Sequence, residues 1–534
     1  MTGSEVVVST AAAVRRTRSG RRARPGPAPG LVFVVATLLT GAVLFARSSY
    51  LFTTHIAEAG DQALNSALAD KAAHFHLLIG NYSRVGFHHP GPAFLYLLAA
   101  GEALFYDVLS VVPSPFNAQL LGVYVADAIM IGLIVRIVYR ITASVAAAAV
   151  SLGVIVLYCG TQPMLAVMWF PFLYVTPFGL LVASATAVAA GYTSELWVFV
   201  LAGCLLIHGH VSFIMFVGVT AIAVAAGWSM THRGSAREEL AAHRSVLVVV
   251  AVIIAVFALP MLIETIGHWP DPWRQYWDYA TGTDVPKHDH PLSRSWHYLT
   301  YYWAKHLGWE IAAILGTVAG LAMTLTERGP ERRRFFTAFY GVAALETVLT
   351  LGYIARGVDE LTEVNRYTCF FYFTVPMLIV AMAAAQLATR AQERDPRAGV
   401  ALLGAGAVMF GAGAAGPRLA STYRGDPALP RMVTAMQDAA PRAGRPVELS
   451  SPGYLWPQEA GIMIAADRAD LPMCIKDPSV STYFTSDALC HGAGGRFTVA
   501  VIDAFDWNGK GRVLWRHGGY VVLAGDDAAF LIAQ

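Results

Sequence analysis

The hydrophobic positions of this chain fall into long runs that are separated by short polar stretches. Most runs are about 18–25 residues long, which is the length that a helix needs to cross roughly 30 Å of hydrocarbon. Backbone polar groups in lipid must pair within their own segment, so these runs predict transmembrane helices. Twelve runs can be distinguished, at residues 31–48, 90–111, 117–139, 143–160, 164–192, 195–210, 211–228, 245–266, 308–326, 335–354, 366–388 and 398–416.

Basic residues predict the side of the membrane on which each loop lies, because cytoplasmic loops carry an excess of Lys and Arg. Residues 1–30 form a basic tail, and three short loops are rich in arginine, so all four are expected in the cytoplasm. The first loop (49–89), the loops 267–307 and 355–365, and the C-terminal part (417–534) are then extracytoplasmic. The arginines of the three short loops are Arg233, Arg237 and Arg244; Arg328 and Arg332 to Arg334; and Arg390, Arg394 and Arg397.

Twelve crossings do not agree with the sides of the membrane that the charged loops predict. Twelve crossings from a cytoplasmic N-terminus would return the C-terminus to the cytoplasm, against the charge pattern. Arg136 and Arg140 also favour a cytoplasmic position that simple alternation denies them. Either one run does not cross, with 90–111 and the short pair around His208 as candidates, or one span was missed. The prediction is therefore 11 or 13 spans.

The last 118 residues change character and predict a separate domain. Short strands are expected at Val447–Ser451, Phe497–Asp503 and Gly519–Ala524, and a helix at Gln458–Arg468. Cys474 and Cys490 lie in this part and could pair if it is extracytoplasmic. The predicted fold is an all-α polytopic transmembrane bundle, residues 31–416, with a small C-terminal extracytoplasmic α/β domain.

Composition excludes a soluble globular protein. Hydrophobic residues make up 56% of the chain and charged residues only 14%, against roughly 25% charged in soluble domains. The arginine-rich tail could indicate nucleic acid, but beside a membrane span it marks the cytoplasmic side, and no nucleic-acid partner is expected. No internal repeat is evident, which weakens a transporter built on inverted repeats.

The first loop holds the candidate chemistry. Asp61 follows Gly60 shortly after the first helix, so its carboxylate is expected at the membrane boundary, where it could accept a proton from a hydroxyl. Arg84, His88 and His89 could bind a phosphate at the same depth. Taken singly, Asp61 is more typical of a helix cap or a solvated loop, and the histidines of an interface. The presence of all these groups in one loop favours a role in catalysis or binding.

The order of these groups resembles the GT-C superfamily of membrane glycosyltransferases, and its actinobacterial cell-envelope members in particular. The resemblance lies in Gly60-Asp61, an amphipathic stretch, Tyr82-Ser-Arg84, and His89-Pro-Gly-Pro opening a helix with Tyr96. The Met168–Pro171 turn and the His208-Gly-His210 element also resemble segments of that family. One departure is that many members have two adjacent acidic residues, whereas Gln62 follows Asp61 here, which leaves Glu58 as the alternative.

The resemblance implies an inverting glycosyltransferase with a polyprenyl-phosphate sugar donor and a lipid or glycan acceptor of the cell envelope. Asp61 would be the general base. The implied substrate and phosphate ligands are Tyr82, Arg84, His88, His89, His208, His210 and Arg274. No metal or cofactor is required, and membrane lipids surround the chain. The alternatives are a polytopic membrane transporter or lipid flippase, and a non-catalytic GT-C-like protein.

The loop 267–307 is dense in aromatic residues. Many Trp and Tyr side chains anchor membrane proteins at the lipid–water interface, and the alternative is stacking on sugar or contact with a lipid chain, with Arg274 as a ligand. Acidic residues inside apolar runs, Glu102, Asp127, Glu264 and Glu346, either line a cavity or are paired structurally. The aromatic residues are Trp269, Trp273, Tyr276, Trp277, Tyr279, Trp296, Tyr298, Tyr301, Tyr302 and Trp303.

Overall fold

The structure is a computed structural model that describes residues 27–83, 86–161, 165, 168–282, 292–304, 307–357, 366–416, 425–440, 446–476, 483–484, 488–491 and 496–525. Most of the basic tail and Arg84 lie outside the described residues.

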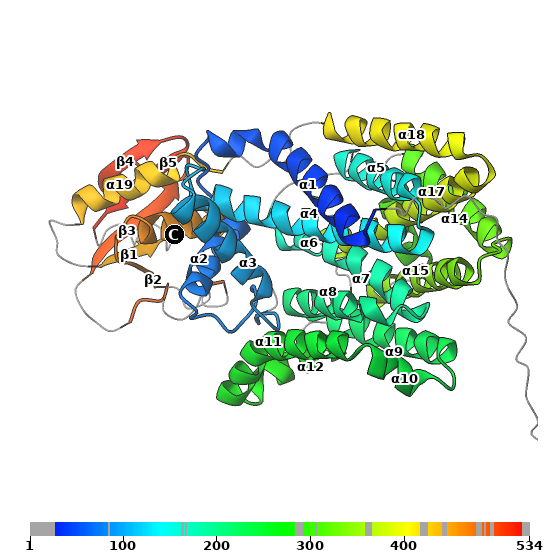
Figure 1. Ribbon diagram of the computed structural model, residues 1–534. Coiled ribbons are helices and arrows are strands. Elements are labelled where there is room, and N and C mark those ends of the chain that lie inside the picture. Colours follow the sequence, from blue (N-terminus) through cyan, green and yellow to red (C-terminus); the bar gives the residue numbers. More distant parts are fainter. Residues whose placement is uncertain are drawn as a thin grey trace, which may run out of the picture.

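A helical bundle forms the larger part of the chain (Figure 1). Among the described residues, nine helical segments are long and apolar enough to cross a membrane, and two shorter apolar helices, α5 and α8, bring the total to eleven. The helices are α1 Pro29–Arg47, α2 Asp61–Ala73, α3 Ala93–Glu102, α4 Pro115–Thr142, α5 Val145–Thr161, α6 Phe170–Leu173, α7 Val175–Ala189, α8 Leu196–Gly209, α9 Phe213–Thr231, α10 Ala236–Ala242, α11 Arg244–His268, α12 Asp271–Thr281, α13 Leu292–Ala304, α14 Leu307–Leu325, α15 Pro330–Gly357, α17 Thr374–Arg394 and α18 Pro396–Ala414.

The run 90–111 is the one predicted run that forms none of these eleven helices. It contains α3, of ten residues, and a six-residue π-helical turn, Ala103–Val108. The α-helical part spans about 15 Å, half the hydrocarbon thickness, before the geometry changes at Ala103. Eleven is one of the two counts that the charge pattern predicts, and the run 90–111 is the first of the candidates that the sequence offers for the segment that does not cross.

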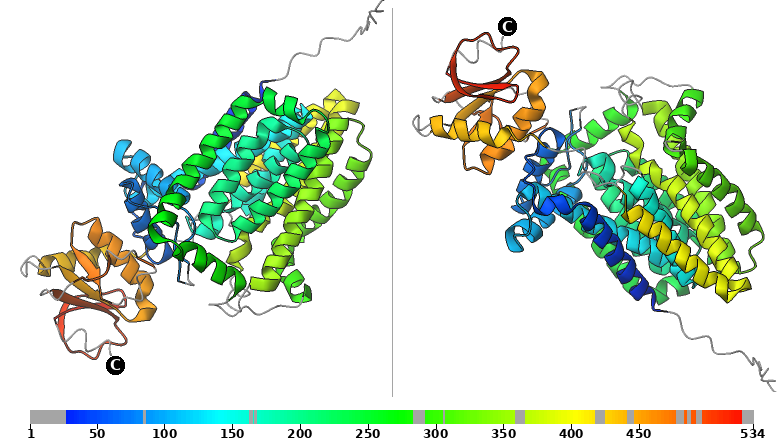
Figure 2. Two further views of the ribbon diagram at one scale, coloured as in Figure 1. Left: turned by 90° about the horizontal axis from the view of Figure 1, so that it is seen from below. Right: turned by 90° about the horizontal axis from the view of Figure 1, so that it is seen from above.

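The bundle has two chemically different ends. In both views of Figure 2, α1 begins at the end remote from the C-terminal domain. That end carries the arginines: Arg136 and Arg140 pair with Glu195, beside Tyr139, whose hydroxyl donates to the carbonyl of Pro27. We refer to it as the arginine end, and to the opposite one as the domain end.

Small residues let helices that are distant in sequence approach closely. Gly153 and Gly160 of α5 face Gly406 and Gly413 of α18, and a Cβ at Gly413 would lie 2.6 Å from the backbone of Val156. Close contact between helix backbones through small residues is typical of membrane bundles, where lipid offers no hydrophobic driving force. This contact fixes α18, from which the chain continues into the C-terminal domain.

The C-terminal domain is a five-stranded sheet of order β2-β1-β3-β5-β4 with helices α19 and α20. Strand β1 is parallel to β2 and β3, and β5 is antiparallel to β3 and β4. The predicted strands and helix are confirmed. Cys474 and Cys490, whose pairing the sequence leaves open, form a disulfide. The bounds are α19 Leu429–Ala439, β1 Val447–Ser450, α20 Trp456–Asp467, β2 Met473–Ile475, β3 Phe497–Asp503, β4 Arg512–His517 and β5 Tyr520–Ala524.

Candidate functional site

Asp61 lies at the domain end, as the first residue of α2. The preceding Gly60 has φ of +59°, in the left-handed region that favours glycine, and this turn starts the helix. A carboxylate in the first turn is stabilised by the exposed N–H groups and the dipole of its own helix. Helix α2 lies between the bundle and the C-terminal domain (Figure 1).

Two side chains fix the carboxylate of Asp61. The hydroxyl of Tyr82 donates to Oδ1, and the indole N–H of Trp169 donates to Oδ2 over 2.8 Å. Burial, followed by the nearby Asp61 charge, raises the pKa of the Tyr82 phenol, so Tyr82 stays a donor. Because a carboxylate oxygen accepts more than one hydrogen bond, each oxygen keeps capacity for a further donor. The carboxylate is therefore oriented and can still accept a hydrogen bond from a further donor.

Aromatic rings from distant parts of the chain surround this acid. Tyr367 packs 4.9 Å from the ring of Trp169, and Tyr483 of the C-terminal domain packs edge-on against Tyr82 at 5.2 Å. Trp456 stacks on Tyr483 at 6.2 Å. Sequence reasoning missed Tyr367, Trp456 and Tyr483, because no local pattern links them to a loop more than 300 residues earlier.

Arg366 supplies a positive charge beside this aromatic cluster. Its guanidinium lies over the ring of Tyr301, 4.3 Å from the centroid, and its carbonyl accepts a hydrogen bond of 2.6 Å from Tyr302. Arginine over an aromatic face keeps its charge while its N–H groups remain available at the edge. Sequence reasoning missed this residue too; the available signal was an arginine at the first position of the predicted apolar run 366–388.

A short hairpin carries the predicted histidines. Gly80 N–H donates to the carbonyl of His89, His89 N–H donates to that of Asn81, and Tyr82 faces His88 across the pair. A Cβ at Gly80 would lie 2.7 Å from the carbonyl oxygen of His89, so the strands approach closely only because position 80 is glycine. The hairpin thus places Tyr82 against Asp61 and His88 on the opposite strand.

Burial favours the neutral forms of His88 and His89. It lowers the pKa of His88, whose Nδ1 lies 3.1 Å from the carbonyl of Gly80. It brings the pKa of His89 well below its ordinary value, with repulsion from His210 and His88 as further causes. The rings of His89 and His210 are 4.2 Å apart. A phosphate role for these two histidines stays a prediction.

The remaining predicted ligands lie apart from the Asp61 carboxylate contacts. His208 packs on Gly91, and its Nε2 pairs with the carbonyl of Phe257 at 2.8 Å. Burial lowers the pKa of His210 to about 4. Arg274 is three-quarters exposed on α12 and lies 3.7 Å from Asp278 on the same helix. Their roles as ligands stay predictions, and Arg84 lies outside the described residues.

Glu58, the alternative acid, is occupied by a contact between domains. Its side chain is 2% exposed and pairs with Arg468, which follows α20, over 2.5 Å. Two backbone hydrogen bonds flank this pair: Gly60 N–H donates to the carbonyl of Pro457, and Asp426 N–H donates to that of Ala57. The C-terminal domain is thereby fixed to the segment that leads into Asp61.

Comparisons of sequence with known proteins give no match, either to a family model or to a curated protein. Comparisons of structure do. ArnT from Cupriavidus metallidurans, in its crystal structure bound to undecaprenyl phosphate, aligns with a TM-score of 0.54 at 14% identity, over 93% of this chain and 98% of that chain. Its apo form gives 0.44 at 12% identity, over 94% and 98%. The oligosaccharyltransferase of Archaeoglobus fulgidus gives 0.39 at 10% identity, over 89% and 69%.

The ArnT alignment extends over nearly the whole of both chains, so the bundle and the C-terminal domain are matched together. At 14% identity this likeness concerns the fold, and it agrees with the resemblance that the first loop predicts from residues 58–98. The chain therefore has the fold of the ArnT structure, over the bundle and the C-terminal domain together.

Proposed function

We propose that this protein is an integral membrane glycosyltransferase that moves a sugar from a polyprenyl-phosphate donor to a lipid or glycan acceptor of the cell envelope. Two findings support this function. The fold is that of GT-C enzymes, and the ArnT structure that it matches holds undecaprenyl phosphate, a lipid of the proposed donor class. The single observation that carries the proposal is the carboxylate of Asp61, held by Tyr82 and Trp169 at the domain end.

The proposed reaction follows from that carboxylate. Asp61 accepts the proton of an acceptor hydroxyl as its oxygen attacks the anomeric carbon of the donor sugar. The bond from that carbon to the phosphate oxygen breaks, and the polyprenyl phosphate leaves with the electron pair. Attack opposite the leaving group inverts the anomeric configuration.

The leaving phosphate gains negative charge, so a nearby cation would stabilise the transition state. Arg366 is the described residue that best fits this role, because it lies beside Tyr367, whose ring contacts Trp169. Arg84 follows Tyr82 by two residues in sequence and is a second candidate.

We propose the extracytoplasmic face for this reaction. The arginine end has the charge expected of the cytoplasmic side, and the disulfide Cys474–Cys490 at the other end suits an oxidising compartment. The N-terminus is then cytoplasmic, the C-terminal domain extracytoplasmic, and the membrane the plasma membrane.

The decisive experiment measures sugar transfer by the purified full chain in lipid nanodiscs from a panel of radiolabelled polyprenyl-phosphate sugars. Asp61→Asn should lower the rate by about 10²–10⁴-fold, the usual contribution of a positioned general base. Asp70→Asn is the matched control, because Asp70 belongs to the same helix and its side chain is 44% exposed.

Undiminished transfer by Asp61→Asn would remove this acid from the mechanism. A wild type that moves lipid-linked sugar across the bilayer without transferring it would support the transporter or flippase alternative, and binding without either activity would support the non-catalytic one.

A further inference from the structure

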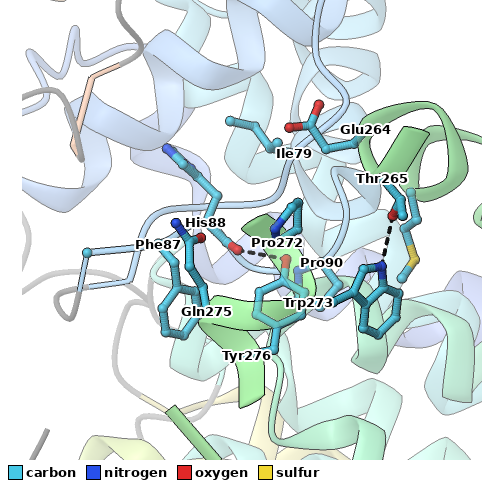
Figure 3. A pocket seen from close by; sticks show the side chains of 12 residues that line it. Ile79, Phe87, His88, Pro90, Glu264, Thr265, Pro272, Trp273, Gln275 and Tyr276 are labelled. Atoms are coloured by element: carbon cyan, nitrogen blue, oxygen red, sulfur yellow. Dashed lines mark hydrogen bonds between the residues drawn. The ribbon is translucent and has the colours of Figure 1, made fainter. Parts of the chain in front are cut away.

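A pocket of about 280 Å³ lies where the hairpin 80–89 meets the corner between α11 and α12. This volume is close to the lower limit of small-molecule sites, roughly 300 Å³. Figure 3 shows the rings of Phe87, Tyr276 and Trp273 along the lower side of the view and Ile79 and Glu264 along the upper side.

The aromatic wall of the pocket is fixed in place. Phe87 and Tyr276 pack edge-on at 5.6 Å, and Tyr276 and Trp273 at 5.9 Å. The hydroxyl of Tyr276 donates to the carbonyl of His88 over 2.9 Å, and the indole N–H of Trp273 donates to Thr265 over 3.0 Å (Figure 3). The rings therefore offer a preformed apolar surface, and a ligand need not order them on binding.

The polar groups of the pocket are mainly hydrogen-bond acceptors. One carboxylate oxygen of Glu264 lies 2.9 Å from His268, and the other has no partner among the described residues. Nδ1–H of His88 donates a hydrogen bond to the carbonyl of Gly80, so Nε2 of the neutral ring keeps a lone pair. Gln275 adds an amide, and the residues that line the pocket in the described part of the chain include no Lys or Arg. Such a site suits hydroxyl groups and repels phosphate.

The pocket and Asp61 are connected through one hairpin. Tyr82, which donates to Asp61, pairs across the hairpin with His88, which lines the pocket. Partners across an antiparallel pair have Cα atoms about 4.5–5.5 Å apart. Two exposed tryptophans lie near the pocket in sequence: Trp269, which follows α11, and Trp277 of α12, with 70% and 69% exposure. Such residues mark the level of lipid headgroups.

We propose that this pocket is a sugar subsite, which holds an uncharged pyranose or furanose ring attached to a membrane-bound substrate. The apolar face of the sugar ring lies on Trp273, and its rim contacts Tyr276, whose plane is nearly perpendicular to that of Trp273 at 79°. The sugar hydroxyls donate to Glu264 and to Nε2 of His88. This inference rests on the proposed function and deepens it, because either the donor or the acceptor can present such a ring.

The test uses the full chain in nanodiscs with a panel of methyl hexosides and methyl pentosides, whose binding is measured by saturation-transfer NMR. Glu264→Gln and Trp273→Ala should each weaken binding of the preferred glycoside by about tenfold or more, as expected for loss of a charged acceptor or of a stacking surface. Trp277→Ala is the matched control, an exposed tryptophan of the same helix outside the pocket. Gln275→Leu replaces Trp273→Ala if that variant does not fold.

The inference is overturned if no glycoside binds wild type, if the pocket variants bind as wild type does, or if inorganic phosphate displaces the glycoside. The KM values of transfer separate the two sources of the ring. A rise of about tenfold in the KM for the donor alone, or for the acceptor alone, supports the subsite and names its occupant; no change in either contradicts it. Asp61→Asn should bind the glycoside as wild type does. If this variant also transfers sugar at the wild-type rate, the proposed reaction is contradicted and the subsite is not.

Discussion

At the scale of single residues, the site depends on hydrogen bonds that aim one carboxylate. Tyr82 and Trp169 each donate to a different oxygen of Asp61. A base that must meet an acceptor hydroxyl within hydrogen-bond distance gains from such fixing, because a misplacement of about 1 Å can cost about a hundredfold in rate.

Tyr82→Phe removes one of these donors and leaves the ring in place. We expect kcat to fall by roughly 10- to 150-fold with KM little changed, the usual cost of a lost hydrogen bond to a charged group. Steady-state transfer kinetics measure it. Tyr96→Phe is the control, since its hydroxyl donates to the carbonyl of Leu77 and not to Asp61. Equal losses in both variants would mean that the effect is not specific to the acid.

At the scale of elements, the C-terminal domain contacts the catalytic segment directly. A Cβ at Gly461 of α20 would lie 2.7 Å from the carbonyl oxygen of Glu58, so helix and segment meet backbone to backbone. The Glu58–Arg468 pair and the Gly60–Pro457 hydrogen bond complete that contact. We infer that the domain positions Asp61.

Arg468→Ala tests this positioning. It leaves the buried Glu58 without a partner, which costs on the order of 3 kcal/mol in a buried pair and less here, because Arg468 is partly exposed. We expect a lower Tm together with a lower kcat, and partial recovery of both in the double variant with Glu58→Gln, which no longer buries a charge.

Arg496→Ala provides the control for Arg468→Ala, because its partner Glu448 lies within the C-terminal domain. It should lower stability without lowering kcat. A kcat that stays at the wild-type value in Arg468→Ala would refute the positioning role.

At the scale of the whole molecule, the two ends of the bundle predict its orientation in the membrane, with the arginine end in the cytoplasm and the domain end outside. In intact cells, a membrane-impermeant maleimide should label neither Cys474 nor Cys490 until a reductant opens their disulfide. Cys159 and Cys369 are buried in the bundle and should stay unlabelled in the native protein. Labelling after reduction that also requires permeabilised cells would place the C-terminal domain in the cytoplasm.

The sequence by itself determined the features that local pattern encodes. Apolar runs of membrane length predicted the bundle, arginine blocks predicted an odd number of spans, and Gly60-Asp61 pointed to the acid. Each of these features can be read from a stretch of sequence about one helix long. The reason is that the length of an apolar run and the charge of the loop beside it are local properties of the chain.

Only the tertiary structure decided which groups meet Asp61. Trp169 lies 108 residues after Asp61 in sequence. Arg468, which pairs with Glu58 three residues before Asp61, lies about 400 residues after Glu58. Such partners are brought together by the packing of helices and loops that are distant in sequence, and residue spacing does not predict this packing. The same holds for the run 90–111, whose hydropathy resembles that of a span. Its break into a short helix and a π-turn depends on packing against α2, α4 and α8.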